Sequence, residues 1–419
     1  MMAERLTIRQ RTVTRWRILV RSAVRIGWPR TDKDRAAVMI SSLFLHIHPA
    51  RVSRHVLRPT YTLGLGLVSA VLFAVLTLTG LALMFYYVPY PPEAYRSMKD
   101  LQFVVTFGII LRNMHRWSAH AMVAVVFFHM CRVFWTGSYK SPREFNWVVG
   151  VVLFLLTLLL SFTGYLLPWD QLAFWAITVG TNIAAYAPVV GDQTKFLLLG
   201  GHVIGPMTLL RFYVMHCVLL PLAMAMLVSL HVWRVRKDGL SGAPRLDRPV
   251  EETAGAFPAS TKTYGLMALT RRPTVSVEAR DPDDEVFAWP HLLYRELLVT
   301  VAVIVALHVV SLLFTAPLEG IADPTRTPNP AKAPWYFLGL QELVSHSAFI
   351  GGVLVPALVV LALVVLPYVD RRPDGVGRWF APERRVANTI FTTIAAIAIV
   401  LTVIGTFFRG PNWAWVWPW

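Results

Sequence analysis

Seven long apolar segments constrain the fold of this chain more than any other feature of its sequence. They cover residues 61–88, 113–136, 146–167, 207–235, 292–315, 348–369 and 388–408. A helix needs about 20 apolar residues to cross the hydrocarbon core of a bilayer, and backbone in lipid must satisfy its own hydrogen bonds. With 55% hydrophobic and only 15% charged residues, the chain is too apolar for a soluble enzyme. We therefore expect an all-α, polytopic membrane protein.

The basic residues indicate the orientation of these segments. The formal net charge is +16, and its excess is concentrated before residue 59. Basic flanks of membrane spans favour the cytoplasm, so the N-terminus is predicted to be cytoplasmic and the C-terminus to lie outside. Residues 11–28 place arginines on one helical face and apolar residues on the other, which is typical of an amphipathic helix on a lipid surface; a mobile basic tail is the alternative. The charge is explained without nucleic acid, and we expect no such partner.

Loop composition predicts the domain organisation. The longest polar interruption, 236–290, lacks apolar periodicity and is predicted to be a cytoplasmic linker. It separates a four-span front half, 61–235, from a three-span back half, 291–419, and a basic region, 1–60, precedes both. Two outer loops, at 165–193 and 317–347, are rich in proline and aromatic residues. We expect the first to form a short surface helix and both to wall a pocket for an apolar ring compound, unless their aromatics only form an interfacial belt.

Two pairs of histidines suggest a redox cofactor. His115 and His129 are fourteen residues apart in one span, and His216 and His231 are fifteen apart in another. Helical geometry places the first pair on nearly one face, roughly 21 Å apart along the axis. A lone histidine in an apolar helix is usually a hydrogen-bonded interior residue, but two matched pairs favour two stacked haems at two membrane depths.

Glycines and arginines fit the same interpretation. Two spans each carry a pair of glycines fourteen residues apart, the same interval as His115 to His129: Gly66 with Gly80, and Gly150 with Gly164. A glycine at each haem depth would let the backbone approach a flat macrocycle closely. Generic packing of small residues between helices would explain one such pair but not the shared interval. Four arginines near the histidines are candidate partners for haem propionates: Arg112, Arg116, Arg132 and Arg211. Cys131 and Cys217 form no haem-attachment motif, so any haem would be non-covalent.

Four motifs carry a family resemblance: HRWSAH at 115–120, FTGYLLPWDQ at 162–171, LLRFYVMH at 209–216 and PWYF at 334–337. With them the chain resembles the cytochrome b subunit of the cytochrome bc (quinol:cytochrome c oxidoreductase) family, in a fused form with chloroplast-type features in its front half. The resemblance implies a four-helix di-haem bundle followed by three further transmembrane helices. It also implies that His115 and His216 bind the outer haem and that His129 and His231 bind the inner one.

The resemblance further implies an outer quinol site at Trp169, Asp170, Trp335 and Tyr336. The family usually has Pro-Glu-Trp-Tyr there, but this chain has Ala333-Pro334-Trp335-Tyr336 and lacks the glutamate that accepts a proton. Because quinol oxidation releases two protons, a base is still required. Glu342 is our first substitute, Asp170 the second and His346 a third. Arg236 is a candidate at an inner quinone site, and the altered motif favours menaquinol as substrate.

These features lead us to expect a di-haem core that bifurcates electrons from quinol. One electron would go to a Rieske-type iron–sulfur protein, and the other would cross the membrane to an inner quinone site, with proton translocation. A c-type cytochrome subunit, a homodimeric complex and a prokaryotic cytoplasmic membrane are also expected. The alternatives are a di-haem membrane anchor that passes electrons without bifurcation and a haem-free transporter whose histidines relay protons.

Overall fold

The computed structural model describes residues 8–23, 28–42, 45–241 and 285–418. Most of the predicted linker, at 242–284, lies outside these described residues. Within them, the front half extends to Asp238, where α11 ends, and the back half begins with α12 at Ala288. The end of α11 and the start of α12 thus lie just inside the segment 236–290 that the sequence predicts to be a linker.

Seven helices among the described residues are long and apolar enough to cross a membrane, which confirms the expected fold class. They are α4 (Leu65–Met84), α6 (Gly108–Trp135), α7 (Glu144–Tyr165), α10 to α11 (Pro206–Asp238), α12 (Ala288–Leu313), the span Ile350–Val369 that ends with α14 (Val355–Val369), and α15 (Arg385–Phe407). Because most of these helices are apolar on all faces, many large hydrophobic side chains remain exposed at the surface, as expected of a lipid-facing protein.

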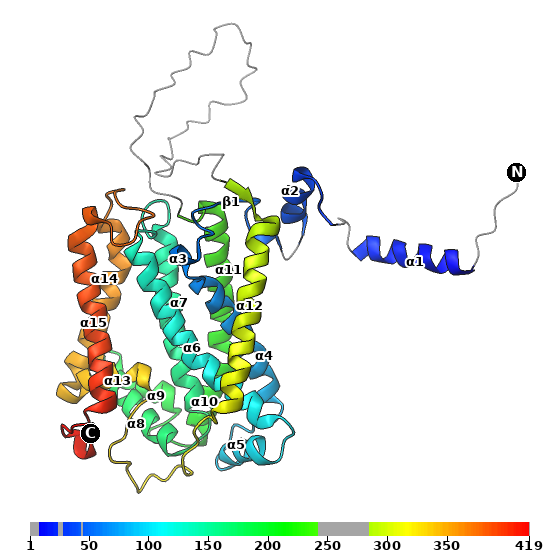
Figure 1. Cartoon of the computed structure of the whole chain (residues 1–419). Helices are drawn as coiled ribbons and strands as arrows, with labels where there is room; N and C mark the ends of the chain where they lie inside the picture. The colour runs from blue at the N-terminus through cyan, green and yellow to red at the C-terminus, as the bar shows by residue number, and fades with distance from the viewer. Residues whose placement is uncertain (1–7, 24–27, 43–44, 242–284, 419) are drawn as a thin grey trace, which may run out of the picture.

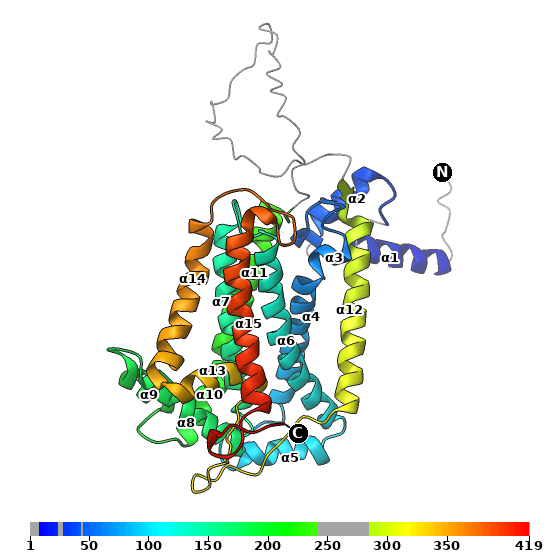
Figure 2. The same ribbon diagram turned by 60° about the vertical axis from the view of Figure 1, so that its left-hand side comes forward.

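The front-half helices pack together as one bundle. Helix α6 packs against α4 and α7, α7 packs against α11, and α12 lies across α4 and α6. In the back half, α14 packs against α7 and α15 packs against α13 (Trp335–His346). Figures 1 and 2 show the seven long helices side by side, with α14 and α15 on the flank of the bundle beside α7.

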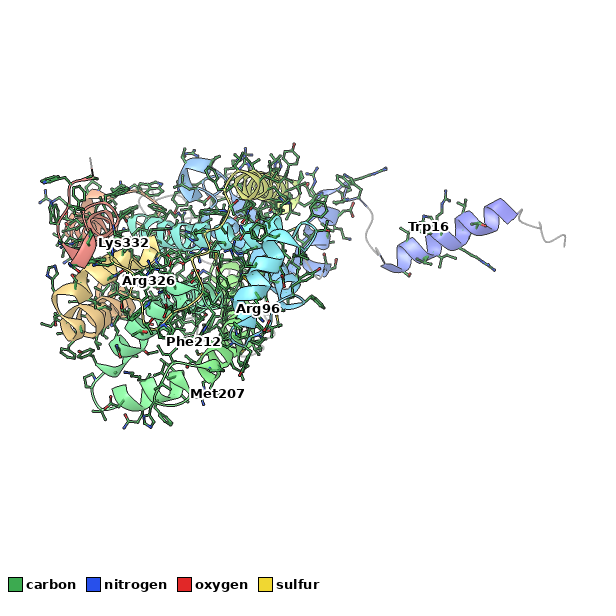
Figure 3. The ribbon with its side chains drawn as sticks, turned by 90° about the horizontal axis from the view of Figure 1, so that it is seen from below. Trp16, Arg96, Met207, Phe212, Arg326 and Lys332 are labelled. Atoms are coloured by element: carbon green, nitrogen blue, oxygen red, sulfur yellow. The ribbon has the colours of Figure 1, made fainter. Side chains whose placement is uncertain are left out.

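Short elements gather at the two ends of the bundle. At one end lie α5 (Glu93–Phe103), α8 (Gln171–Ala185), α9 (Gly191–Leu199) and the start of α13 (Figure 1). Figure 3 views this end and shows Arg96, Arg326 and Lys332 on it. At the other end lie α2 (Asp32–Ser41), α3 (Pro59–Thr62) and the two short strands β1 (Arg51–Ser53) and β2 (Glu285–Phe287), which pair antiparallel. Helix α1 (Ile8–Ala23) projects beside this end (Figure 1).

Two of these elements differ from the sequence prediction. The loop at 165–193 contains helix α8 and the start of α9, rather than one short helix. Helix α5 was not predicted, because its sequence EAYRSMKDLQF is polar and short. Both differences concern surface helices, whose stability comes from packing on the bundle rather than from membrane insertion.

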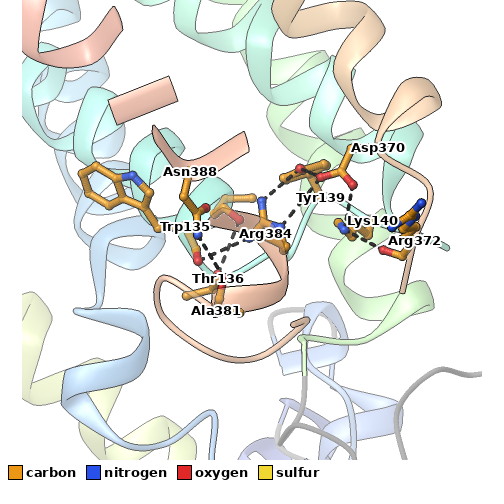
Figure 4. Close-up of polar contacts among 10 residues, drawn as sticks. Trp135, Thr136, Tyr139, Lys140, Asp370, Arg372, Ala381, Arg384 and Asn388 are labelled. Atoms are coloured by element: carbon orange, nitrogen blue, oxygen red, sulfur yellow. Dashed lines mark hydrogen bonds and ion pairs between the residues drawn. The ribbon is translucent and has the colours of Figure 1, made fainter. Parts of the chain in front are cut away.

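A buried polar cluster joins the two halves at the end that carries β1 and β2 (Figure 4). The hydroxyl of Tyr139 donates to the carboxylate of Asp370, whose other oxygen lies 2.9 Å from Lys140 Nζ. Arg384 donates to the Tyr139 hydroxyl at 2.9 Å. Lys140 and Arg384 are only 2% and 4% exposed. The loop after α6 is thereby bonded to the loop between α14 and α15.

Asp370→Asn is expected to destabilise the protein by about 3 kcal/mol, because removing one partner of a buried ion pair leaves an uncompensated charge. Here two cations, Lys140 and Arg384, would lose their anion. The matched control is Glu383→Gln in the same loop, whose ion pair with Arg378 is exposed and screened by solvent, so its loss should change stability far less. Thermal unfolding in detergent, followed by tryptophan fluorescence, measures both; equal melting temperatures for the two variants would contradict the prediction.

Candidate functional site

The structure brings the four predicted ligand histidines together in two pairs. The ring centroids of His115 and His216 are 6.2 Å apart, and those of His129 and His231 are 6.5 Å apart. Two metal–nitrogen bonds of about 2 Å, plus about 1 Å from each ring nitrogen to its centroid, give roughly 6 Å for two imidazoles on one metal. The spacing within each pair therefore suits a single iron between two rings.

The local helix geometry at His216 departs from the regular α-helix. Residues Met215–Leu219 form a π-helical turn, η2, between α10 (Pro206–Val214) and α11 (Leu220–Asp238). Pro221 follows the turn two residues after Leu219 and lacks a backbone N–H, which removes one bond from the regular ladder. A π-turn shifts the register of the following residues, so the fifteen-residue interval between His216 and His231 still places both rings opposite the rings of α6.

Two threonines fix the tautomers of the outer histidines. Thr79 Oγ1 donates to the carbonyl of Val75 at 2.7 Å, so at its 2.9 Å contact it accepts from His115 Nδ1. Thr163 Oγ1 likewise donates to Leu159 at 2.9 Å and accepts from His216 Nδ1 at 3.1 Å. With the proton on Nδ1, each Nε2 keeps a free lone pair, which is the form that binds a metal.

Each of the four predicted glycines lies against one of the four histidines. A Cβ atom on Gly164 would lie 2.5 Å from His216 Cε1, and one on Gly80 would lie 3.1 Å from His115 Cε1. At the other depth, the corresponding distances are 3.2 Å for Gly66 with His129 and 3.7 Å for Gly150 with His231. The glycines thus clear the space beside each imidazole, as a planar macrocycle requires.

The predicted arginines have different surroundings. Arg116 Nε is buried and has no hydrogen-bond partner within the described part of the chain, so it is available to an anion such as a propionate. Three others donate to backbone carbonyls: Arg112 to Ala316 and Pro317, Arg132 to Tyr61, and Arg211 to Leu197. Three features together fit a haem at the predicted outer position: paired histidines in the ligand tautomer, a glycine beside each ring, and an arginine whose buried Nε lacks a partner in the described part of the chain. The inner position has the same pairing, and the Nδ1 atoms of His129 and His231 lack partners among the described residues.

The two aromatic loops that the sequence predicts on the outer side meet at one end of the bundle. Residues of the 165–171 segment pair with the loop from 317, since Gln171 donates to Gly320 at 2.9 Å and Ala322 donates to Trp169 at 3.2 Å. Trp169 is buried in one cluster with Tyr165, and Phe337 packs against that cluster. The segments that contain the predicted quinol-site residues are therefore assembled at one end of the bundle.

Asp170 lies buried at the start of α8. Its carboxylate accepts from Ala173 N at 2.9 Å and from Glu319 N at 3.2 Å, so it caps the helix and holds the neighbouring loop. Burial raises the pKa of Asp170, although these backbone bonds oppose the shift. Asp170 is therefore a carboxyl group that takes up a proton more readily than an ordinary aspartate.

Glu342 is also buried, but its environment is the opposite. Its carboxylate binds Arg409, with Nε at 3.0 Å, and accepts from Trp413 Nε1 at 2.9 Å. The hydrogen bond from Arg409 lowers the pKa of Glu342. A carboxylate held ionised by these partners is suited to anchoring the C-terminal segment, which disfavours our first choice of substitute base. His346, the third choice, is exposed and lies 3.6 Å from the same carboxylate.

Trp335 and Tyr336 begin α13 and face α6. Trp335 donates from Nε1 to His120 Nδ1 at 3.0 Å, and the rings of Tyr336 and His120 are 5.4 Å apart. Burial raises the pKa of Tyr336 to about 12, so its hydroxyl stays protonated.

At the opposite end of the bundle, Arg236 lies half-buried in the last turn of α11.

Sequence reasoning missed three of these residues. Thr79 and Thr163 each precede a glycine that faces an outer histidine, and the repeated Thr-Gly pair in spans one and three could have identified them. His120 was assigned no role, because its partner Trp335 is 215 residues away in the sequence. The same limitation hid a chain of hydroxyls near Arg132, in which Tyr61, Ser241 and Ser138 are linked by bonds of 2.5 and 2.6 Å.

Comparison with known proteins agrees with this geometry. The family model described as cytochrome b/b6/petB matches residues 49–239, and the model described as cytochrome b(C-terminal)/b6/petD matches residues 321–417. The first match covers the four-span bundle with all four histidines. The second covers α13 and the last two spans.

Several similar proteins are cytochromes b6 of cyanobacteria. One from Prochlorococcus marinus is 44% identical over 178 residues, which is 42% of this chain and 82% of that protein. One from Synechocystis sp. is also 44% identical over 178 residues, covering 42% of this chain and 80% of that protein. A solved chain of a hyperthermophilic respiratory Complex III has a similar fold, with a TM-score of 0.70 and 24% identity over 88% of each chain. With this sequence similarity across the histidine-bearing helices and the matched back half, the chain belongs to the cytochrome b/b6 family, a family of membrane oxidoreductase subunits that bind b-type haem and quinone.

Proposed function

We propose that this chain is the di-haem core of a quinol-oxidising complex. In this proposal quinol is oxidised at the end of the bundle where α8 and α13 lie. Its two electrons then follow different routes: one reduces a Rieske-type iron–sulfur protein, and the other crosses the membrane to reduce a quinone at an inner site. The observation that carries the proposal is the arrangement of two histidine pairs at two depths of one bundle, each ring faced by a glycine.

Bound haems would supply one-electron carriers at the two depths, and the chain's own residues set their surroundings. His115 with His216, and His129 with His231, would hold the metals. Thr79 and Thr163 orient the rings of His115 and His216, and a hydrogen bond to the Nδ1–H of a ligand histidine increases the basicity of its Nε2. The apolar bundle keeps water away from the path between the two depths.

The buried carboxyl of Asp170 is the proton acceptor that we favour. It lies where the 165–171 segment meets the loop from 317, and burial raises its pKa. Glu342, in contrast, is held ionised by Arg409. Only the carboxylate form accepts a proton, so quinol oxidation should accelerate as the pH rises through this raised pKa.

Asp170→Asn is expected to abolish this pH dependence and to slow quinol oxidation by about 100-fold, the usual contribution of a positioned general base. Asparagine keeps one side-chain oxygen that can cap α8, which limits structural damage. Asp192→Asn, which changes an exposed carboxyl in the first turn of α9 at the same end of the bundle, is the matched control and should keep the wild-type pH profile. Identical pH profiles for the two variants would exclude Asp170 as the acceptor.

Further features of the proposal follow from the family and from sequence. We place the N-terminus in the cytoplasm of a prokaryote, because the basic residues cluster before the first span. A c-type cytochrome subunit and a second copy of the chain would complete the complex. The Ala333-Pro334-Trp335-Tyr336 motif supports menaquinol as the substrate, and Arg236 is our candidate for the inner quinone site.

A redox titration of the purified complex tests the proposal. We expect two b-type absorbance transitions of different midpoint potential, together with quinol-dependent reduction of an external high-potential acceptor. Absence of b-type absorbance would overturn the haem assignment. Two haems without oxidation of quinol by a high-potential acceptor would instead favour a di-haem anchor.

A further inference from the structure

His120 lies on α6, five residues after His115, and faces the start of α13. Its Nδ1 receives the indole N–H of Trp335 at 3.0 Å. An indole N–H can only donate, so Nδ1 must be the unprotonated nitrogen of the neutral ring. The proton of His120 therefore lies on Nε2. This tautomer is the opposite of the one that Thr79 imposes on His115.

The Nε2 atom of His120 is buried and has no hydrogen-bond partner among the residues that the structure describes. Buried N–H donors in proteins are nearly always paired, so an unpaired one needs an explanation. Two close neighbours cannot supply the acceptor, because Arg116 on the same helix is a cation and Trp335 already donates to the other ring nitrogen. The Nε2 proton is therefore available to an acceptor on a bound molecule.

The surroundings of His120 indicate what kind of molecule this is. Its ring lies 5.4 Å from the ring of Tyr336 and 5.4 Å from that of Trp117, and Trp335 and Tyr336 are themselves 5.4 Å apart. Trp335 is 39% exposed, so the aromatic group is open on one side. Flat aromatic walls around one donor suit an aromatic ring that carries an oxygen acceptor.

We propose that His120 Nε2 donates a hydrogen bond to a ring oxygen of the quinol or quinone in the outer site, and that Trp335 holds His120 in the donor tautomer. This inference rests on the proposed function and adds a substrate-binding residue to it. His120 gives up no proton in this role. When the quinol hydroxyl passes its proton to a base elsewhere in the site, its oxygen gains negative charge and the bond from His120 becomes stronger.

The test compares three substitutions in the purified complex, with dimethylnaphthoquinol as the substrate. His120→Leu removes the donor, and His120→Gln supplies an amide N–H in its place. Trp335→Phe keeps an aromatic ring but removes the indole N–H, so His120 is no longer held in the tautomer that carries its proton on Nε2. His308→Leu is the matched control, because His308 lies on another span and its Nδ1 bonds only to Ile304 of its own helix.

We expect His120→Leu to raise KM for the quinol by about tenfold or more, the effect of losing one hydrogen bond to a substrate oxygen. His120→Gln should recover part of this loss, Trp335→Phe should show an intermediate loss, and His308→Leu should match the wild type. A second readout is the infrared carbonyl stretch of bound, carbonyl-labelled dimethylnaphthoquinone. A hydrogen bond lowers this frequency, and His120→Leu should raise it towards that of the free quinone.

The outcomes separate this inference from the proposed function. If the wild-type complex shows two b-type transitions and oxidises the quinol, the proposed function stands. Unchanged KM and carbonyl frequency in a haem-replete His120→Leu complex would then overturn the role of His120 alone. If the wild-type complex binds haem but oxidises no quinol, both inferences fail.

Discussion

Replacing His216 with leucine is expected to remove the outer haem and to abolish quinol oxidation. His216 supplies one of two imidazoles whose rings are 6.2 Å apart, and a leucine there has no lone pair to offer. Changing a residue that only hydrogen-bonds to a metal ligand costs about 10- to 100-fold in affinity or activity, so loss of the ligand itself should exceed about 100-fold. The redox titration should show a single b-type transition in place of two.

Two companion variants make this prediction specific. His129→Leu should remove the other transition and leave the one that is lost in His216→Leu. Thr163→Val keeps both outer ligands but removes the acceptor for His216 Nδ1, so it should shift the outer midpoint potential without emptying the site. If His216→Leu membranes retained both transitions, the assignment of His216 as a ligand would be wrong.

Gly164→Ala is expected to displace the outer histidine, while Gly150→Ala on the same helix should be tolerated. A Cβ atom on Gly164 would lie 2.5 Å from His216 Cε1, far inside van der Waals contact, so the ring or the helix must move. At Gly150 the corresponding distance to His231 Cε1 is 3.7 Å, an ordinary contact. Overpacking of this kind costs about 1–3 kcal/mol, or about 5- to 150-fold in haem affinity.

Haem content and the two midpoint potentials measure this difference. Gly164→Ala should reduce and shift the outer transition, and Gly150→Ala should leave both transitions close to their wild-type values. The two substitutions add the same methyl group to the same helix, α7, so effects on helix propensity cancel. Equal effects of the two variants would show that the glycines serve general helix packing rather than the histidines.

The Glu342 and Asp170 assignments illustrate how far sequence reasoning reached. Glu342 was the preferred base because it lies two helical turns after Trp335 in a segment that does form a helix, α13. Its actual partner, Arg409, is 67 residues away, and no pattern in the sequence connects them. Asp170 was ranked second, but its burial between α8 and the loop from 317 raises its pKa, and burial is a property of the folded chain.

The sequence by itself determined the spans and the register of groups along each helix. Lipid forces apolar segments to satisfy their own backbone hydrogen bonds, so they become helices, and a helix fixes the relative positions of His115 and His129 or of Gly150 and Gly164. Tertiary structure decided what meets across helices and loops. The contacts of His120 with Trp335 and of Thr163 with His216 depend on how separate segments pack. The partners are 215 and 53 residues apart in the chain, so no local sequence pattern connects them. The same packing also sets the tautomers, so the form in which each histidine can act is a property of the fold.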